Sequence, residues 1–214
     1  MPNKRVAELQ LRTRAGTLQG RVCWPGSRLA RAPRLLVFFA VADCADWCRE
    51  LSSEARLVVL SATPAGLDDA ITAAEWAAEN AARLGAQPGQ LLIGGAGHGG
   101  TLAAAAARHA HARGWPAFRR QVLVCASPAE RTLPSLGGLP PVTAVTVEHD
   151  PAGDAGRYAA ALRAAGVVVD EIRYAAADQA HAARVRTSPG LLAELGSALR
   201  SADEDELPGR KEVS

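Results

Sequence analysis

The chain has 214 residues, of which 48% are hydrophobic, and this combination indicates one globular domain with a sizeable buried core. Its formal net charge of +2 is too small to indicate a nucleic-acid partner. No apolar run reaches the roughly 18–20 residues that cross a membrane, and residues 1–20 lack the apolar core of a secretory signal peptide. We therefore expect a cytoplasmic protein with neither a nucleic-acid nor a membrane partner.

The first elements that the sequence predicts are two strands. Apolar and polar residues alternate over 6–13 and again over 17–24, with Ala15-Gly16 between the two segments. Alternation with a period of two is typical of a strand that has one buried and one exposed face. The pattern predicts an antiparallel hairpin at the edge of a sheet.

The rest of the chain alternates between strand-like and helix-like segments. Strands are predicted over 34–41, 57–60, 91–96, 121–125, 142–147 and 167–174. Helices are predicted over 43–53, 68–84, 102–113, 153–165 and 189–200. The earliest of these strands are apolar on both sides, as in sheets that helices cover on both faces. We therefore expect an α/β fold with a doubly wound, mostly parallel sheet.

The predicted domain covers residues 1–201, and a polar tail follows over residues 202–214. The tail opens with four acidic residues, Asp203 to Glu206, and offers little apolar surface to bury. We expect this tail to be disordered. The sequence shows no internal repeat and no second domain.

The segment Leu91-Leu92-Ile93-Gly94-Gly95-Ala96-Gly97-His98-Gly99-Gly100-Thr101 indicates a site. An apolar strand breaks into glycines, and the chain resumes as an alanine-rich run from Leu102 to Arg108. Only glycine readily tolerates the positive φ and close backbone approach that a sharp turn needs. The sequence thus predicts a strand, a sharp turn and a helix, the place where α/β proteins present their chemistry.

This segment resembles the nucleophile elbow of the α/β-hydrolase fold, in the G-D-S-A-G-G-x-L-A-A form of the hormone-sensitive-lipase-like esterases. The positions that match this pattern are Gly95, Gly99, Gly100, Leu102 and Ala103. Ala96 stands where the family has an acid, and Gly97 stands where it has the nucleophilic serine. The segments 73–85 and 158–167 also resemble helices of these enzymes. The resemblance implies an α/β-hydrolase fold, here without a cap domain.

The same resemblance implies where the other triad residues would lie. The family's acid falls on Asp150, and its base falls near residue 179, where His181 is the nearest histidine. The family's H-G-G-G segment, whose amides hold an oxyanion, is replaced by Ala40-Val41-Ala42-Asp43. A carboxylate there opposes a developing negative charge, and a triad without its nucleophile has no covalent route. We therefore expect no serine esterase activity of the usual kind.

Three interpretations of the altered site remain open, one of them an interaction protein whose exposed sheet edge or last helix forms a homodimer. In the first of the other two, the chain is a non-hydrolytic pseudoenzyme that binds a small ligand or a protein partner. In the second, it is an enzyme for a small substrate, with His98 as the base for water, Asp150 orienting it, and His181 or Cys44 assisting. The alternative is that His98 faces away from the cleft or caps the helix, and that Asp150 is a turn or N-cap residue. An irregular loop that brought Ser127 toward the site would add a further hydroxyl, and no cofactor is expected.

Four cysteines, Cys23, Cys44, Cys48 and Cys125, are present in a chain too large to need disulfides for its stability. We expect them to be reduced thiols. Cys44 and Cys48 are four residues apart, which places them on one face of a helix. Two thiols fall short of the four ligands of a structural zinc site, so we predict no metal there.

Overall fold

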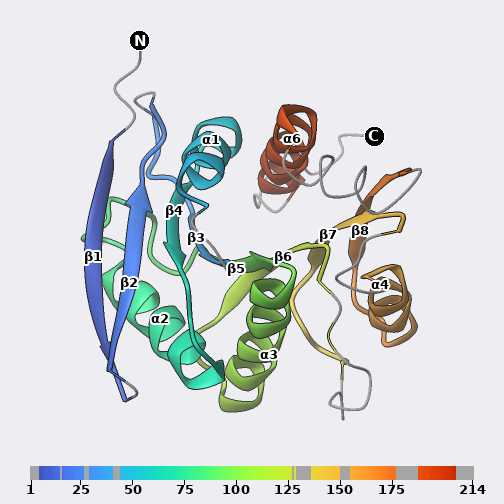
Figure 1. The fold of residues 1–214 in the computed structure, drawn as a ribbon, viewed down its shortest axis with the longest axis horizontal. Helices are drawn as coiled ribbons and strands as arrows, with labels where there is room; N and C mark the ends of the chain where they lie inside the picture. The colour runs from blue at the N-terminus through green and yellow to red at the C-terminus, as the bar shows by residue number, and fades with distance from the viewer. Residues whose placement is uncertain are drawn as a thin grey trace, which may run out of the picture.

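The computed structural model describes residues 5–14, 16–26, 29–40, 44–126, 128, 136–149, 155–176 and 188–205. Eight strands form one sheet in the order β1-β2-β4-β3-β5-β6-β7-β8 (Figure 1). They are β1 (Val6–Thr13), β2 (Gly16–Cys23), β3 (Leu35–Phe39), β4 (Val58–Ala62), β5 (Leu91–Ala96), β6 (Phe118–Val124), β7 (Val142–Val147) and β8 (Val169–Tyr174). The pairs β1–β2 and β2–β4 are antiparallel, and the other pairs are parallel. The predicted hairpin and mostly parallel sheet are confirmed.

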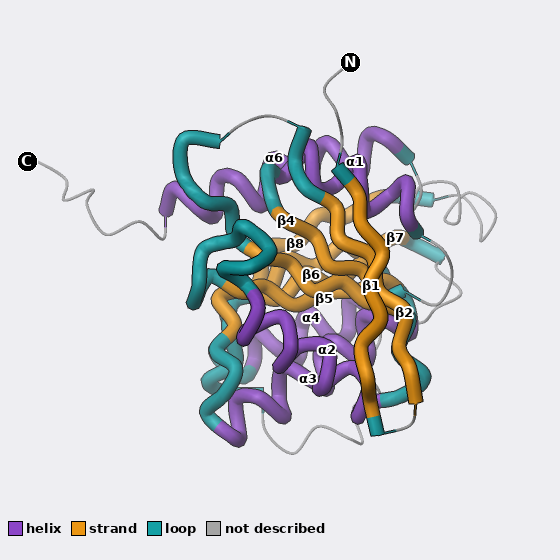
Figure 2. The backbone as a smooth tube through the Cα atoms, turned by 90° about the vertical axis from the view of Figure 1, so that its left-hand side faces the viewer, coloured by secondary structure: helices purple, strands orange, loops and turns teal. Residues whose placement is uncertain are grey.

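Helices cover both faces of this sheet (Figures 1 and 2). On one face, α1 (Ala45–Ala55) and α6 (Pro189–Asp205) lie side by side. On the other face lie α2 (Leu67–Asn80), α3 (His98–Arg113) and α4 (Ala155–Ala164). The described residues form no separate cap domain. In the same part of the chain, no helix is both long and apolar enough to cross a membrane.

The strand β3 shows why a fully apolar run is needed at the centre of the sheet. Leu35 and Val37 belong to the apolar core under α2 and α3, whereas Leu36 and Phe38 belong to the core under α1 and α6. Each of these side chains is at most 1% exposed. Because successive side chains point to opposite faces, a strand between two helical layers needs apolar residues at every position.

Two helices end at least four residues away from their predicted ends. The helix α2 ends at Asn80 rather than residue 84, and its chain continues as a turn to Gly85, which has a φ of 74°. The Ala86 N–H closes that turn on the Ala81 carbonyl at 2.9 Å. The helix α6 continues to Asp205, beyond the predicted end at residue 200. Residues 206–214 lie outside the described part, so their disorder stays a prediction.

One carboxylate joins the last strands to the helix between them. The Glu171 side chain is 8% exposed; it accepts a hydrogen bond from Thr146 of β7 at 2.9 Å and contacts Arg163 of α4 at 2.9 Å and Arg173 at 3.1 Å. Burial alone would raise the pKa of this carboxyl, but the three hydrogen bonds outweigh it and hold the pKa below its ordinary value of 4.5. Ionised Glu171 therefore stabilises the β7–β8–α4 corner.

We expect Glu171→Gln to lower the free energy of unfolding at pH 7 by about 1 kcal/mol, because both arginines are partly exposed and screened by water. Since folding lowers this pKa, the stabilisation is present above pH 4.5 and is lost as the pH falls through the folded-state pKa. Urea unfolding of both chains from pH 7 to pH 3 measures the difference. The exposed Glu148→Gln serves as the matched control, and a difference that persists at pH 3 would contradict the assignment.

Candidate functional site

The predicted strand, sharp turn and helix are present at the carboxyl end of β5. The strand ends at Ala96, Gly97 forms the turn with φ 53° and ψ −121°, and α3 begins at His98. The Gly97 N–H donates to the Val124 carbonyl of β6 at 2.9 Å, and the Gly97 carbonyl accepts from the Thr101 N–H at 3.1 Å. The turn is thus held by the neighbouring strand on one side and by the first turn of α3 on the other.

Four glycines around this turn are required by packing. A Cβ atom at Gly94, Gly95, Gly99 or Gly100 would lie within 3.0 Å of other atoms. At Gly99 these atoms are the backbone of Phe39 and Ala40, and at Gly95 they are the backbone of α3 itself. The start of α3 therefore contacts the ends of β3 and β5 backbone to backbone.

Gly97 differs from these four glycines. A Cβ atom at Gly97 would meet nothing within 4 Å, so packing does not exclude a side chain there. Its positive φ is the only local feature that favours glycine. A side chain at position 97 would project into open space at the point where the elbow presents its residue.

Among the predicted site residues, His98 and Cys44 lie in the described part of the chain. The His98 side chain is exposed at the start of α3, directly after Gly97, whereas Cys44 is half-buried at the start of α1. Asp150, His181 and Ser127 lie outside the described residues, as do positions 41–43. Their proposed roles therefore stay predictions, and His98 is the predicted site residue that the structure places at the elbow.

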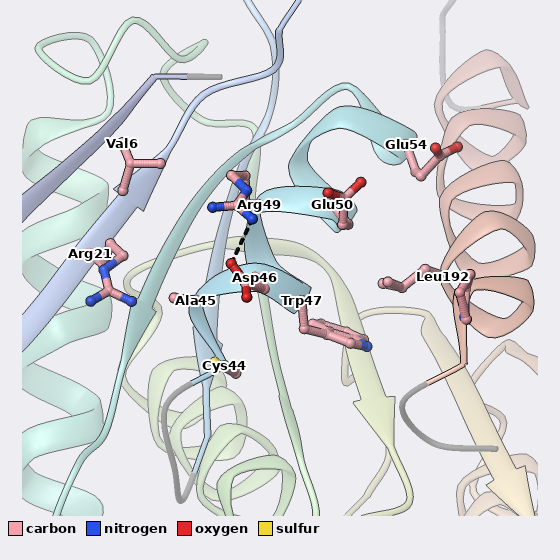
Figure 3. A pocket seen from close by; sticks show the side chains of 11 residues that line it. Val6, Arg21, Cys44, Ala45, Asp46, Trp47, Arg49, Glu50, Glu54 and Leu192 are labelled. Atoms are coloured by element: carbon pink, nitrogen blue, oxygen red, sulfur yellow. Dashed lines mark ion pairs between the residues drawn. The ribbon is translucent and has the colours of Figure 1, made fainter. Parts of the chain in front are cut away.

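A cavity of about 860 Å³ lies against α1, at a place that the sequence did not indicate (Figure 3). Trp47 of α1 and Leu192 of α6 line it together, and Arg49 pairs with Asp46 at 2.6 Å beside them. The other lining residues are Val6, Arg21, Cys44, Ala45, Glu50, Glu54 and Pro189. Because this wall combines a hairpin and two helices far apart in the sequence, no local pattern reveals it.

A family model described as the alpha/beta hydrolase fold matches residues 35–135. The chain is also 32% identical over 154 residues to Esterase LipI of Mycobacterium tuberculosis, in a match that covers 63% of this chain and 48% of LipI. The chain therefore has the α/β-hydrolase fold. The resemblance to esterases of the hormone-sensitive-lipase-like group, predicted from the elbow, is confirmed.

Two further comparisons agree with this fold. This chain is 31% identical over 166 residues to Carboxylesterase NlhH of M. tuberculosis, in a match that covers 56% of this chain and 52% of NlhH. It therefore spans about half the length of these curated relatives. The solved esterase from Pyrobaculum calidifontis shares the fold at a TM-score of 0.79 and 22% identity, covering 93% of this chain and 86% of that one.

The four cysteines form no disulfide in the structure, as predicted. Cys44 is the N-cap residue of α1 and is half-buried, whereas Cys48 lies one turn further and is fully buried. Their Sγ atoms are 3.3 Å apart. The hydrogen bond with Cys44, together with burial, raises the pKa of the Cys48 thiol well above its ordinary value.

The elbow glycines separate into two classes that mutation can distinguish. We expect Gly99→Ala to lower the free energy of unfolding by more than about 3 kcal/mol, because its Cβ would overlap the Phe39 backbone. We expect Gly97→Ala to lower it by only about 1–2 kcal/mol, the cost of a positive φ without a clash. Urea denaturation measures both values. Gly114→Ala, at φ 72° in open space, is the control for a positive φ without a clash, and a Gly97→Ala loss as large as that of Gly99→Ala would contradict the distinction.

Proposed function

We propose that this α/β-hydrolase-fold protein is a non-hydrolytic member of an esterase-like family, which binds a small ligand instead of cleaving an ester. The observation that carries the proposal is Gly97, which occupies the turn between β5 and α3 and has no side chain. Covalent ester hydrolysis needs an oxygen or sulfur nucleophile at that turn. The fold therefore keeps the frame of an esterase site without the atom that attacks the substrate.

The surroundings of the elbow support the same proposal. Thr101 carries the nearest hydroxyl in the first turn of α3, but its Oγ1 donates to the Gly97 carbonyl at 3.4 Å and is directed back along the helix. The segment Ala40-Val41-Ala42-Asp43 follows β3, where the esterases that this chain resembles have glycines. A side chain at each of these positions leaves less room for amides to approach an oxyanion.

A binding role has a structural basis in the cavity against α1. Its wall combines the indole of Trp47 and the Leu192 side chain with charged groups from β2 and α1. Apolar surface with a few polar groups is the usual lining of a small-molecule site. The ligand proposed here is therefore small, partly apolar and able to accept or donate hydrogen bonds at one end. The alternative is that this cavity binds a protein partner, such as a second copy of this chain.

The second candidate function is hydrolysis by an activated water. The exposure of His98 beside the open space at Gly97 favours it, since a histidine there could accept a proton from water. In this alternative, Asp150 orients or charge-balances the imidazole, and His181 assists. Mutation can separate it from the binding role because it requires both His98 and Asp150.

Hydrolysis of 4-nitrophenyl butyrate tests the proposal directly. We expect the natural chain to release nitrophenol no faster than a matched protein-free buffer, because it has no nucleophile at the elbow. Gly97→Ser adds a hydroxyl in open space, and Gly114→Ser adds one at a similar φ far from the elbow as a control. Activity in Gly97→Ser alone would show that the remaining site can still use a serine.

Turnover by the natural chain would contradict the non-hydrolytic proposal. If that turnover fell at least tenfold in His98→Ala and in Asp150→Asn, the water-activating alternative would replace it. Turnover that is unchanged in both variants would exclude that alternative as well. Thermal unfolding of each variant shows whether a loss reflects chemistry or folding.

A further inference from the structure

The start of α1 brings two cysteines together on the wall of the cavity. Cys44 lines both the cavity of about 860 Å³ and a neighbouring one of about 330 Å³, so molecules in either can reach its sulfur. Cys48 lies one turn into the helix, is 0% exposed, and has its Sγ 3.3 Å from that of Cys44. A half-buried thiol on the cavity wall thus lies next to a fully buried one.

We propose that Cys44 and Cys48 form a redox-active dithiol, in which Cys44 undergoes exchange with a low-molecular-weight disulfide and Cys48 then resolves the mixed disulfide. This proposal is independent of the elbow and of ester hydrolysis. It assigns a reversible modification site to the first turn of α1.

The position of the two sulfurs supports these different roles. Cys44 is the N-cap of an 11-residue helix, whose dipole stabilises a thiolate at that end. The charged side chains on the cavity wall do not add to this effect, because Arg21 and Arg49 lie there with Asp46, Glu50 and Glu54. The buried Cys48 has no such exposure to solvent and keeps its proton more tightly, since its pKa is raised by the Cys44 hydrogen bond and by burial. Cys44 is therefore the attacking sulfur.

The geometry also permits the two sulfurs to bond. A disulfide has an S–S length of about 2.0 Å, so the sulfurs must approach by only about 1.3 Å from their 3.3 Å separation. Cys44 has φ −113° and ψ 24°, outside the regular helix, and its carbonyl accepts a hydrogen bond from the Cys48 N–H at 2.8 Å. Because this bond holds the N-cap in place, the sulfurs approach each other by rotation of the two side chains.

The proposed exchange balances in two steps. The Cys44 thiolate attacks one sulfur of the reagent, forming a mixed disulfide and breaking the reagent S–S bond, and one reagent thiolate leaves with the electron pair. Cys48 then loses its proton to solvent and attacks the Cys44 sulfur, which expels the second reagent thiolate. The protein dithiol is oxidised by two electrons, the reagent disulfide is reduced by two, and the released thiolates take up the two protons.

Peptide mapping after incubation with oxidised glutathione tests the proposal on the natural chain. Trypsin cleaves after Arg34 and Arg49, so the peptide 35–49 contains Cys44 and Cys48 and no other cysteine. We expect this peptide to lose two hydrogens and to resist alkylation. We also expect it to react at least about tenfold faster than the buried Cys23 and Cys125, which are at most 1% exposed.

Single variants separate the two roles. Cys48→Ser should stop at a glutathione adduct on Cys44, and Cys44→Ser should leave the buried Cys48 unmodified. Cys125→Ser is the matched control and should behave as the natural chain does, because Cys125 follows β6, is only 1% exposed and lines neither of the two cavities. A persistent glutathione adduct on Cys44 of the natural chain, with no cross-linked peptide 35–49, would overturn the proposal. Equally fast modification of Cys48 in Cys44→Ser would overturn it too.

Discussion

The backbone contact between α3 and the sheet is the constraint on which the elbow depends. The first turn of α3 lies against the ends of β3 and β5 so closely that Gly95, Gly99 and Gly100 have no room for a Cβ atom. This contact fixes where the helix starts and how sharply the chain turns at Gly97. It also aligns the first N–H groups of α3 with the carboxyl edge of the sheet, where parallel α/β proteins bind their ligands.

Position 97 itself takes no part in this constraint. Gly97 contributes nothing to the contact, since a side chain there would face open space. The two apolar cores, divided by strands such as β3, are built from residues that do not include position 97. The packing of the fold therefore does not depend on the residue at position 97, and the α/β-hydrolase fold does not by itself define the activity.

The α1 side of the molecule offers chemistry of a different kind. Phe38 of β3 stacks on Trp47 with ring centroids 4.8 Å apart, which places the first turn of α1 over the end of the central strands. Cys44 and the cavity wall follow from that packing. The thiol pair and the cavity lined by Trp47 (Figure 3) thus lie in the helical layer of α1 and α6, on the face of the sheet opposite to α3.

Local sequence patterns determined the strands, their burial and the elbow. Period-two alternation distinguished the edge hairpin from the fully apolar strands, and the glycine run located the turn at Gly97, because these features depend on neighbours within a few residues. The spacing of Cys44 and Cys48 likewise predicted that they share one helix face.

Contacts between distant segments were decided only by the tertiary structure. Helix ends such as Asn80 and Asp205 depend on what the last turns pack against, and the cavity combines β1, β2, α1 and α6. The buried Glu171 has partners on β7, β8 and α4, a combination that no periodic pattern records. Periodicity reports which face of an element is buried, whereas the partners of that face are set by sheet order and packing.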